Sequence, residues 1–428
     1  MRPNLAPTKT GVFRFYDYLE TLRSPVAPQI RFAASLLLVR SFAGAAGRTG
    51  DYDLLKYLNA KLNESEFALG RTRLYSMPTL LRVGATRRCN LRCITCGVGH
   101  RTAEEERRYR AEGRMDLEVR DYNLVAENVF PYLREIQFGQ NGEAFVLGDR
   151  FFAMLAEAEA RRVGITVSTN GMLLDRSSIQ KLLGLSHLRW VTFSLDGSTK
   201  QTLERVRVGA NFERIVDTIR LFAAMRSDPD RPALRIHFTA ARSNLVELPA
   251  VVDLASDLGV QEVSAAYLYV NPHVPLRESL YFAKEEANRV MAAAARRAAD
   301  RGVRFAGPPP FKGETKAGGF RCPSPWNGPS LVPGGYLMPC CVLYRKDHFM
   351  GHAQEGFEKV WNNARYRRLR RAIVLKRPFI EKCRYCNLHR EGFDPDSLPF
   401  HVTEELLDTV LGSAGAGGDA RSPALGNP

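Results

Sequence analysis

The sequence has no cysteine before residue 89, none between residues 96 and 322, and none after residue 386. A small secreted domain held by disulfides would spread its cysteines through the whole chain. The eight cysteines form two separate groups instead. We therefore expect reduced thiols with a metal-binding or catalytic role, in a protein of the cytoplasm.

Long apolar runs are also scarce. The most apolar stretch, Phe32–Val39, has eight residues between Arg31 and Arg40, whereas a bilayer span needs about 20. The segment Met1–Tyr18 lacks the apolar centre of a signal peptide. We expect a core helix at Phe32–Val39 and no transmembrane segment, with contact to a membrane surface as the lesser alternative.

Acidic residues are outnumbered, since the chain has 46 Asp and Glu and 61 Lys and Arg, which gives a net charge of +15. Such an excess could attract nucleic acid, anionic lipid or an acidic protein, or be spread over a solvated surface. The densest run, Arg365–Arg371, lies on a predicted helix. We expect a solvated face there, or a docking surface for an acidic flavodoxin or ferredoxin, and no nucleic-acid partner.

A length of 428 residues indicates two or three domains. Residues 1–80 read as a helical extension. From 81 to 270, short β-like runs alternate about six times with amphipathic helices, which predicts parallel strands with right-handed crossovers. The fold class is therefore α/β, a partial (β/α)6 barrel with its site at the carboxyl ends of the strands. The predicted strands are Leu80–Ala85, Glu135–Phe138, Gly164–Ser168, Trp190–Leu195, Leu234–Ala240 and Glu262–Leu268.

The rest of the chain divides into three parts. We expect a linker at 271–320 that contains a helix, Lys284–Arg301, and a small domain at 321–395 with one helix, Phe357–Val374. Residues 396–428 form a C-terminal tail. From about residue 412 the tail consists of small and polar residues, which predicts disorder.

The first cysteine group is a C-x3-C-x2-C loop, Cys89, Cys93 and Cys96, directly after the first predicted strand. A 4Fe–4S cluster normally takes four thiolates. Three thiolates leave one iron open to another ligand, as in catalytic metal sites. The alternatives are three buried thiols, or a zinc site with His100 as the fourth ligand.

This loop and the motifs after it resemble the radical S-adenosylmethionine (SAM) superfamily over roughly residues 80–390. The resemblance implies that the amino and carboxylate groups of SAM chelate the open iron. It also implies reductive cleavage of SAM to methionine and a 5′-deoxyadenosyl radical, which removes a hydrogen atom from the substrate.

The resemblance extends to three later segments. Gly139–Glu143 is similar to the family's GGE motif, although Gln140 and Asn141 depart from it. Ser168–Gly171 and Ser194–Gly197 end the third and fourth predicted strands. Thr95 occupies a position that is often aromatic in the family. The cofactor contacts that the resemblance implies are Thr95, Gly142, Glu143, Ser168, Asn170, Ser194 and Arg207.

The second cysteine group resembles the SPASM/twitch extension, most closely the twitch form of 2-deoxy-scyllo-inosamine dehydrogenase-type proteins. That resemblance implies one auxiliary 4Fe–4S cluster, with a zinc ribbon as the alternative. Cys341 is then left over, either as a small buried residue or as a hydrogen-atom donor. The implied ligands are Cys322, Cys340, Cys383 and Cys386.

These features predict an enzyme that oxidises or epimerises a carbohydrate or aminocyclitol carbon in secondary metabolism. The alternative is a maturase that modifies a ribosomally synthesised peptide, so the substrate is a small molecule or a peptide. A non-enzymatic electron carrier or zinc protein is a third hypothesis. His237, Tyr267 and Tyr269 lie near the ends of the fifth and sixth strands, where packing is the expected role.

Overall fold

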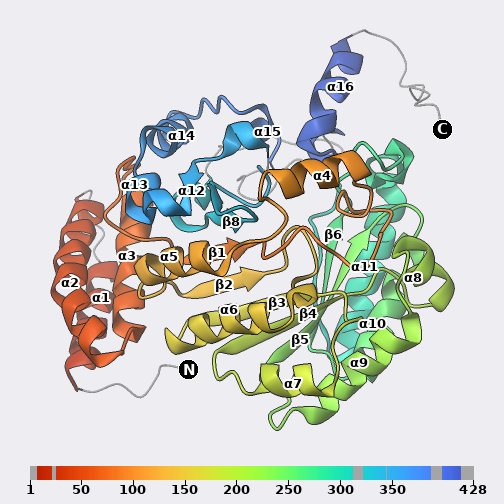
Figure 1. The fold of residues 1–428 in the computed structure, drawn as a ribbon, viewed down its shortest axis with the longest axis horizontal. Helices are drawn as coiled ribbons and strands as arrows, with labels where there is room; N and C mark the ends of the chain where they lie inside the picture. The colour runs from red at the N-terminus through yellow and green to blue at the C-terminus, as the bar shows by residue number, and fades with distance from the viewer. Residues whose placement is uncertain (1–6, 22–25, 312–321, 344, 387–397, 416–428) are drawn as a thin grey trace.

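A single curved sheet forms the centre of the molecule (Figure 1). The computed structural model describes residues 7–21, 26–311, 322–343, 345–386 and 398–415. Strand order is β10-β9-β8-β1-β2-β3-β4-β5-β6-β7, and β1 to β7 are all parallel. The sheet does not close on itself, so the partial barrel is confirmed. The strands are β1 Leu80–Val83, β2 Glu135–Phe138, β3 Gly164–Thr169, β4 Leu188–Ser194, β5 Ala233–Ala240, β6 Glu262–Tyr267, β7 Arg304–Ala306, β8 Ser330–Val332, β9 Tyr336–Met338 and β10 Gly351–His352.

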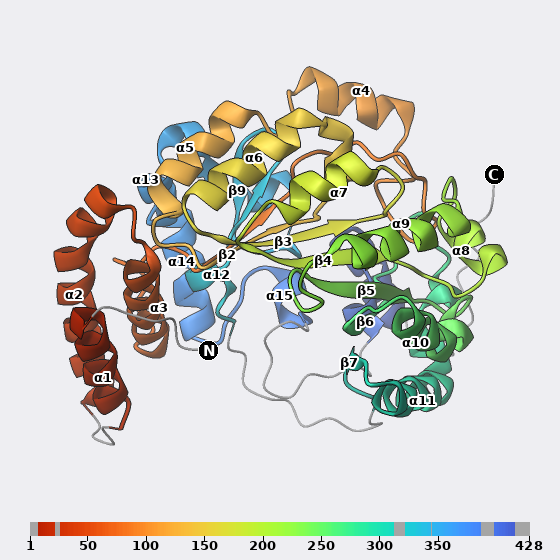
Figure 2. The same cartoon turned by 90° about the horizontal axis from the view of Figure 1, so that it is seen from below.

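Helices join the parallel strands, and Figure 2 shows several of them along the outside of the curved sheet. Their apolar faces and the strands share one core, in which Ile136, Phe193 and Ile236 are fully buried. The helices of this part are α4 Ala103–Ala111, α5 Val119–Val129, α6 Asp149–Ala160, α7 Arg176–Leu183, α8 Lys200–Val206, α9 Phe212–Met225, α10 Leu248–Asp257 and α11 Lys284–Arg301. The C-terminal part has α12 Ser324–Asn327, α13 Phe357–Trp361, α14 Ala364–Val374, α15 Glu381–Arg384 and α16 Glu404–Gly415.

The stretch predicted as a linker contributes to the sheet. Helix α11 has the predicted bounds, and β7 after it pairs in parallel with β6. On the other side of the barrel, β8 pairs in parallel with β1. The alternation of helices and parallel strands therefore continues beyond residue 270. Strand β7 was missed because it has three residues, none of them buried, and so shows no apolar pattern. Residues 312–321 of the stretch lie outside the described residues.

Two further predictions are corrected in the C-terminal part. The single helix predicted at Phe357–Val374 is two helices, because the Asn363 side chain caps α14 by accepting a hydrogen bond from Tyr366 N at 3.0 Å. Disorder from residue 412 is wrong as far as Gly415, where α16 ends. The remainder of that prediction, 416–428, lies outside the described residues.

Three N-terminal helices, α1 Pro7–Thr21, α2 Ala27–Thr49 and α3 Asp53–Ala68, form a bundle at one end of the molecule (Figures 1 and 2). Lys56 of α3 donates hydrogen bonds of 2.7 Å to the carbonyls of Arg161 and Arg162, immediately before β3. Asn59 donates to Met77 O at 3.0 Å, before β1. The bundle therefore lies at the amino ends of the strands, opposite the expected site.

The apolar stretch Phe32–Val39 lies in α2 and is not the buried core helix that its composition predicts. The most apolar segment of α2 is only 18% buried. Within the described part of the chain, α2 is the one helix whose length and composition would suffice to cross a membrane.

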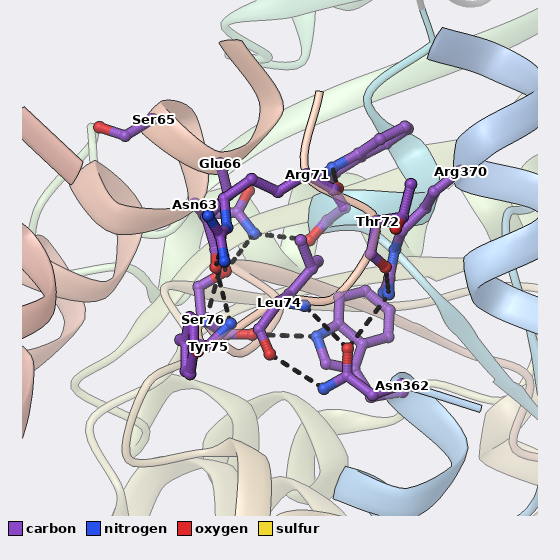
Figure 3. A network of polar contacts seen from close by, with 12 residues as sticks. Asn63, Ser65, Glu66, Arg71, Thr72, Leu74, Tyr75, Ser76, Asn362 and Arg370 are labelled. Atoms are coloured by element: carbon purple, nitrogen blue, oxygen red, sulfur yellow. Dashed lines mark hydrogen bonds and ion pairs between the residues drawn. The ribbon is translucent and has the colours of Figure 1, made fainter. Parts of the chain in front are cut away.

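A buried polar network joins α3 to α14 (Figure 3). The fully buried Glu66 carboxylate accepts hydrogen bonds from Tyr75 N at 2.7 Å and from the Ser76 hydroxyl at 2.6 Å. Asn362 accepts from Leu74 N at 2.8 Å, and the buried Arg370 donates to Thr72 O at 3.1 Å. Because buried polar groups need such partners, the network fixes the connection between α3 and β1 against the C-terminal part.

Candidate cluster and cofactor site

The first cysteine loop lies directly beyond the carboxyl end of β1. The backbone N–H groups of Arg92 and Ile94 donate to the carbonyls on either side of Arg207, both at 2.9 Å. These bonds hold the loop against the end of α8 and bring Arg207 beside the thiols. Cys89 and Cys93 are half-buried, and Cys96 is exposed.

Burial keeps two thiols of this loop, Cys89 and Cys93, in the protonated form. Burial raises the pKa of the Cys93 thiol to about 12, and the nearby Arg207 guanidinium only partly opposes this effect. Burial also raises the pKa of Cys89. Binding of iron must therefore displace the thiol protons, as it does for other thiolate ligands.

The zinc alternative requires His100 as its fourth ligand. Sulfur ligands about 2.3 Å from a tetrahedral zinc would lie about 4 Å from one another. In the described part of the chain, which holds all eight cysteines, no three Cys, His, Asp or Glu side chains are grouped to hold a metal ion. His100 lies 3.0 Å from Ile94 O and stacks on His273. A 4Fe–4S cluster instead binds each of the three thiolates to a different iron.

The turn after β2 fits closely against the segment that leads to Cys89. A Cβ atom on Gly142 would lie 2.3 Å from Arg88 O and 2.6 Å from Thr86 O, so only glycine can occupy this position without a shift. The next residue, Glu143, donates its N–H to Arg88 O at 2.9 Å. The two matching residues of the GGE-like segment are thus fixed beside the cysteine loop.

The Glu143 carboxylate is buried and joins the ends of β2 and β3. It accepts hydrogen bonds from Asn170 N at 2.7 Å and from the Thr169 hydroxyl at 3.1 Å. Burial raises its pKa to about 7, although these hydrogen bonds favour the charged form. A cationic or N–H-donating ligand at this carboxylate would offset the cost of burial.

Asn170 connects β3 to the cysteine loop. Its side-chain amide donates to Asn90 Oδ1 at 2.8 Å and lies 3.9 Å from Cys89 Sγ. Ser168, two residues earlier, faces Gly139, where an added Cβ would lie 2.6 Å from Ser168 Cβ. The end of β3 therefore meets the cysteine loop through Asn170 and the turn after β2 through Ser168.

Arg207 forms a buried ion pair that the sequence analysis did not assign. Its guanidinium lies 2.8 Å from the carboxylate of Asp196, which follows β4 and is itself buried. Asp196 also accepts a hydrogen bond from Thr239 N at 2.7 Å. Although burial opposes it, this pairing raises the pKa of Arg207. The one available signal for Asp196 was its place in the segment Ser194–Gly197.

The remaining predicted contacts are less constrained. Ser194 ends β4 and pairs with His237 of β5 in the sheet, and Thr95 is half-buried in the cysteine loop. His237 Nδ1 lies 2.9 Å from the Ser264 hydroxyl, and burial lowers its pKa. Tyr267 donates its hydroxyl to Pro309 O at 2.9 Å. His237 and Tyr267 thus make internal packing contacts.

The second cysteine group lines one pocket in the C-terminal part. Leu369 and Ile373 of α14 form an apolar wall of this pocket. Burial raises the pKa of Cys322 to about 12 and that of Cys340 well above its usual value. Cys341 lies outside the lining, although it is close enough to affect both of these thiols. The thiols that line the pocket are Cys322, Cys340, Cys383 and Cys386, which is a full ligand set for one 4Fe–4S cluster.

Two family profiles match the chain. The radical SAM superfamily profile matches residues 83–234, and the SPASM profile, described as an iron–sulfur cluster-binding domain, matches residues 322–387. The first match contains the cysteine loop and the ends of β2 to β4. The second contains the four-cysteine pocket.

Curated relatives share only part of their length with the chain. The tungsten-containing aldehyde ferredoxin oxidoreductase cofactor-modifying protein of Pyrococcus furiosus is 29% identical over 187 residues, 43% of this chain and 49% of that protein. A probable GTP 3′,8-cyclase of Methanocaldococcus jannaschii is 23% identical over 201 residues, 47% and 60% of the two chains. The matches thus span about half the length of these relatives.

Solved structures share the fold. Streptococcus suis SuiB bound to S-adenosylmethionine has a TM-score of 0.55 and 15% identity, over 73% of this chain and 72% of that one. Native anSMEcpe with bound AdoMet has a TM-score of 0.53 and 16% identity, over 79% and 99%. Both likenesses concern the fold alone.

Proposed function

We propose that this chain, which belongs to the radical S-adenosylmethionine superfamily and carries a SPASM iron–sulfur domain, oxidises or epimerises a carbon atom of a carbohydrate or aminocyclitol. It is an enzyme with a SAM-binding 4Fe–4S cluster and auxiliary iron–sulfur. When bound, these cofactors supply the one-electron cleavage of SAM to methionine and a 5′-deoxyadenosyl radical, which takes a hydrogen atom from the substrate.

The residues of the site are suited to hold these cofactors. Cys89, Cys93 and Cys96 provide three thiolates and leave one iron for another ligand. Glu143 and Arg207 place a carboxylate and a guanidinium beside the same loop. They complement the amino and carboxylate groups of SAM, so their role is to bind and orient it.

The observation that carries the oxidation proposal is the pocket with four cysteines. A cluster with four thiolates has no open iron, so its role would be electron transfer rather than substrate binding. Oxidation of an alcohol carbon removes one hydrogen atom, which the bound cofactors would accept as 5′-deoxyadenosine, and then one electron and one proton. The thiols of Cys322, Cys340, Cys383 and Cys386 would hold a cluster able to accept the second electron, and loss of the hydroxyl proton to solvent would then leave a ketone.

Epimerisation would instead return a hydrogen atom to the carbon radical, and Cys341 is the candidate donor. A Cys341→Ala variant separates the two reactions. If it still forms the ketone at the wild-type rate, the enzyme is a dehydrogenase. If it accumulates 5′-deoxyadenosine without an epimerised product, Cys341 is the donor.

Peptide modification is the second candidate. SuiB, whose structure with its precursor peptide SuiA has been solved, shares this fold at 14% identity. The bundle α1–α3 lies at the amino ends of the strands, so it does not border the cysteine loop. The reacting part of a peptide would therefore lie apart from this bundle.

Anaerobic reconstitution tests the proposal. We expect about eight irons per chain, from two 4Fe–4S clusters, and 5′-deoxyadenosine after reduction with SAM. Addition of aminocyclitols or sugars should couple 5′-deoxyadenosine to an oxidised or epimerised product. Coupling to a peptide instead would support the maturase, and zinc in place of iron would reject both.

We further propose an acidic flavodoxin or ferredoxin as the electron donor, docked on the outer face of α14. Arg367, Arg368 and Arg371 are exposed there, while Leu369 and Ile373 on the inner face line the four-cysteine pocket. Complementary charge raises the rate of association between redox partners. A double variant, Arg367→Glu with Arg371→Glu, should slow reduction by flavodoxin but not by dithionite. The matched control changes the exposed Arg214 and Arg296 to Glu.

A further inference from the structure

Helix α2 presents an apolar stripe to solvent. Val26, directly before the helix, and Ile30 and Leu37 within it are 53%, 41% and 67% exposed. With the exposed Ala33 between them, they recur at spacings of four, three and four residues, which places them on one face. A helix on the surface of a water-soluble protein places polar residues on this face. The exposed face of α2 is therefore not explained by packing against the described residues of this chain.

The charges around the stripe have one sign. Between Glu20 and Asp51 the sequence has no acidic residue, and α2 carries Arg31, Arg40 and Arg48. Arg40 and Arg48 are exposed beyond the apolar stripe, on the turns that follow Leu37. An apolar face flanked by arginine, without carboxylates, complements an anionic lipid surface.

Exposed aromatic side chains lie in the bundle and in the segment that follows it. Phe15 and Tyr18 of α1 are 45% and 63% exposed, and Tyr75 is 47% exposed. The Arg40 guanidinium lies 5.6 Å from the centre of the Tyr75 ring. Rings with one apolar and one polar edge, paired with arginine, are typical of the membrane interface.

The opposite face of α2 is occupied, so the helix does not stand free to cross a bilayer. Tyr16 and Ser35 form a buried hydrogen bond between α1 and α2, and Arg31 donates to Leu19 O at 3.1 Å. We propose that the bundle α1–α3 lies flat on an anionic membrane surface, with Val26, Ile30 and Leu37 at the boundary between headgroups and acyl chains.

This placement fixes the direction of the cysteine loop relative to the membrane. The bundle contacts the amino ends of β1 and β3 through α3, and the cysteine loop lies at their carboxyl ends. The membrane contact therefore holds the enzyme with its radical site turned away from the lipid. The substrate would approach from water, and the contact fixes location rather than supplying a lipid substrate.

Sedimentation of the full chain with vesicles tests the proposal. We expect binding to vesicles of phosphatidylcholine and phosphatidylglycerol in equal amounts, and much weaker binding to phosphatidylcholine alone or at high salt. Leu37→Glu should weaken binding about tenfold or more, because the loss of one buried leucine has that effect. The matched control is Val246→Glu, which changes a residue of similar exposure, 64%, in the barrel part of the fold.

Three outcomes would overturn the proposal. The first is no binding of the wild-type chain to anionic vesicles, and the second is equal binding by the wild type and Leu37→Glu. The third is a concentration-dependent dimer in solution that Leu37→Glu abolishes, with no vesicle binding, which would make this face a contact between two copies. Arg40→Glu with Arg48→Glu provides an independent variant, expected to abolish the preference for phosphatidylglycerol.

Discussion

Glu143 and Arg207 are buried groups of opposite charge at one edge of the barrel, and they differ in the partners that the protein gives them. Arg207 has a carboxylate partner at 2.8 Å, which offsets part of the cost of burying its charge. Glu143 has only hydrogen-bond donors, and burial raises its pKa to about 7. The site thus holds a carboxylate whose charge becomes favourable when a complementary group binds.

This raised pKa predicts how stability depends on pH in the cluster-free chain. The folded state holds the Glu143 proton up to about pH 7, whereas the unfolded state releases it near the ordinary pKa of 4.5. The protonated form therefore favours folding at low pH, and this contribution is lost as the pH rises through about 7. The free energy of unfolding of Glu143→Gln, measured relative to that of the wild type, should therefore rise by about 2 kcal/mol as the pH increases from about 5.5 to about 8.5. Urea unfolding of both proteins at the two pH values measures this change. A difference between the proteins that does not vary with pH would contradict the raised pKa of Glu143.

The ion pair between Arg207 and Asp196 predicts a non-additive pair of substitutions. Asp196→Asn leaves a buried guanidinium without its partner and should lower the free energy of unfolding by about 3–5 kcal/mol, and Arg207→Gln should cost a similar amount. The double variant should lose clearly less than the sum. Urea unfolding of the four proteins gives the coupling energy. Simple additivity would show that the two side chains act independently.

At the scale of elements, the site depends on how closely the turn after β2 approaches the cysteine loop. An added methyl group at Gly142 would overlap two backbone carbonyls, whereas nothing lies within 4 Å of the position that it would take at Gly97 in the loop itself. The two glycines lie in neighbouring parts of the site but differ in the space around them. Replacing each glycine by alanine therefore distinguishes the effect of steric overlap from the effect of losing a glycine near the site.

Gly142→Ala should weaken SAM binding about tenfold or more, because overpacking of about 1–3 kcal/mol must be relieved by moving the turn and Glu143. Gly97→Ala should bind SAM nearly as wild type. Equilibrium binding of SAM to the reconstituted proteins, with iron content as the control, measures both. Equal effects of the two substitutions would mean that the close approach is unimportant.

The elements around the barrel were predictable because their buried residues repeat with clear periods. Strand β2 was predicted with its observed bounds, and α11 likewise. The break between α13 and α14 was missed because no proline or glycine separates the two helices, and the cap at Asn363 is a single side-chain contact. Asp196 was missed because its partner lies 11 positions away in the chain, and an ion pair of this kind leaves no periodic signal.

At the scale of the whole molecule, the two cysteine groups occupy different places in one continuous sheet. The first follows β1, and the second surrounds a pocket beyond β8 and β9. The exposed face of α2 shows the limit of sequence reasoning at this scale. Its apolar composition predicted burial, but composition does not reveal whether the fold supplies a covering partner.

This separation predicts that the auxiliary cluster can be removed alone. The double variant Cys383→Ala with Cys386→Ala should bind about four irons fewer per chain after reconstitution. The first loop is unchanged, so SAM cleavage to 5′-deoxyadenosine should persist while formation of oxidised product stops. Iron analysis and product chromatography measure both, and loss of SAM cleavage would show that the two sites are interdependent.

The parallel pairing of β1 with β8 has a consequence for synthesis of the chain. Strand β1 lies at residues 80–83, and its partner at 330–332 emerges from the ribosome about 250 residues later. At roughly 5–20 residues per second, the delay is on the order of 10–50 seconds. During this time the barrel can form, but one edge of β1 has no strand beside it. An open edge can pair with another chain, so nascent copies on one messenger RNA are exposed to mutual strand exchange until β8 arrives.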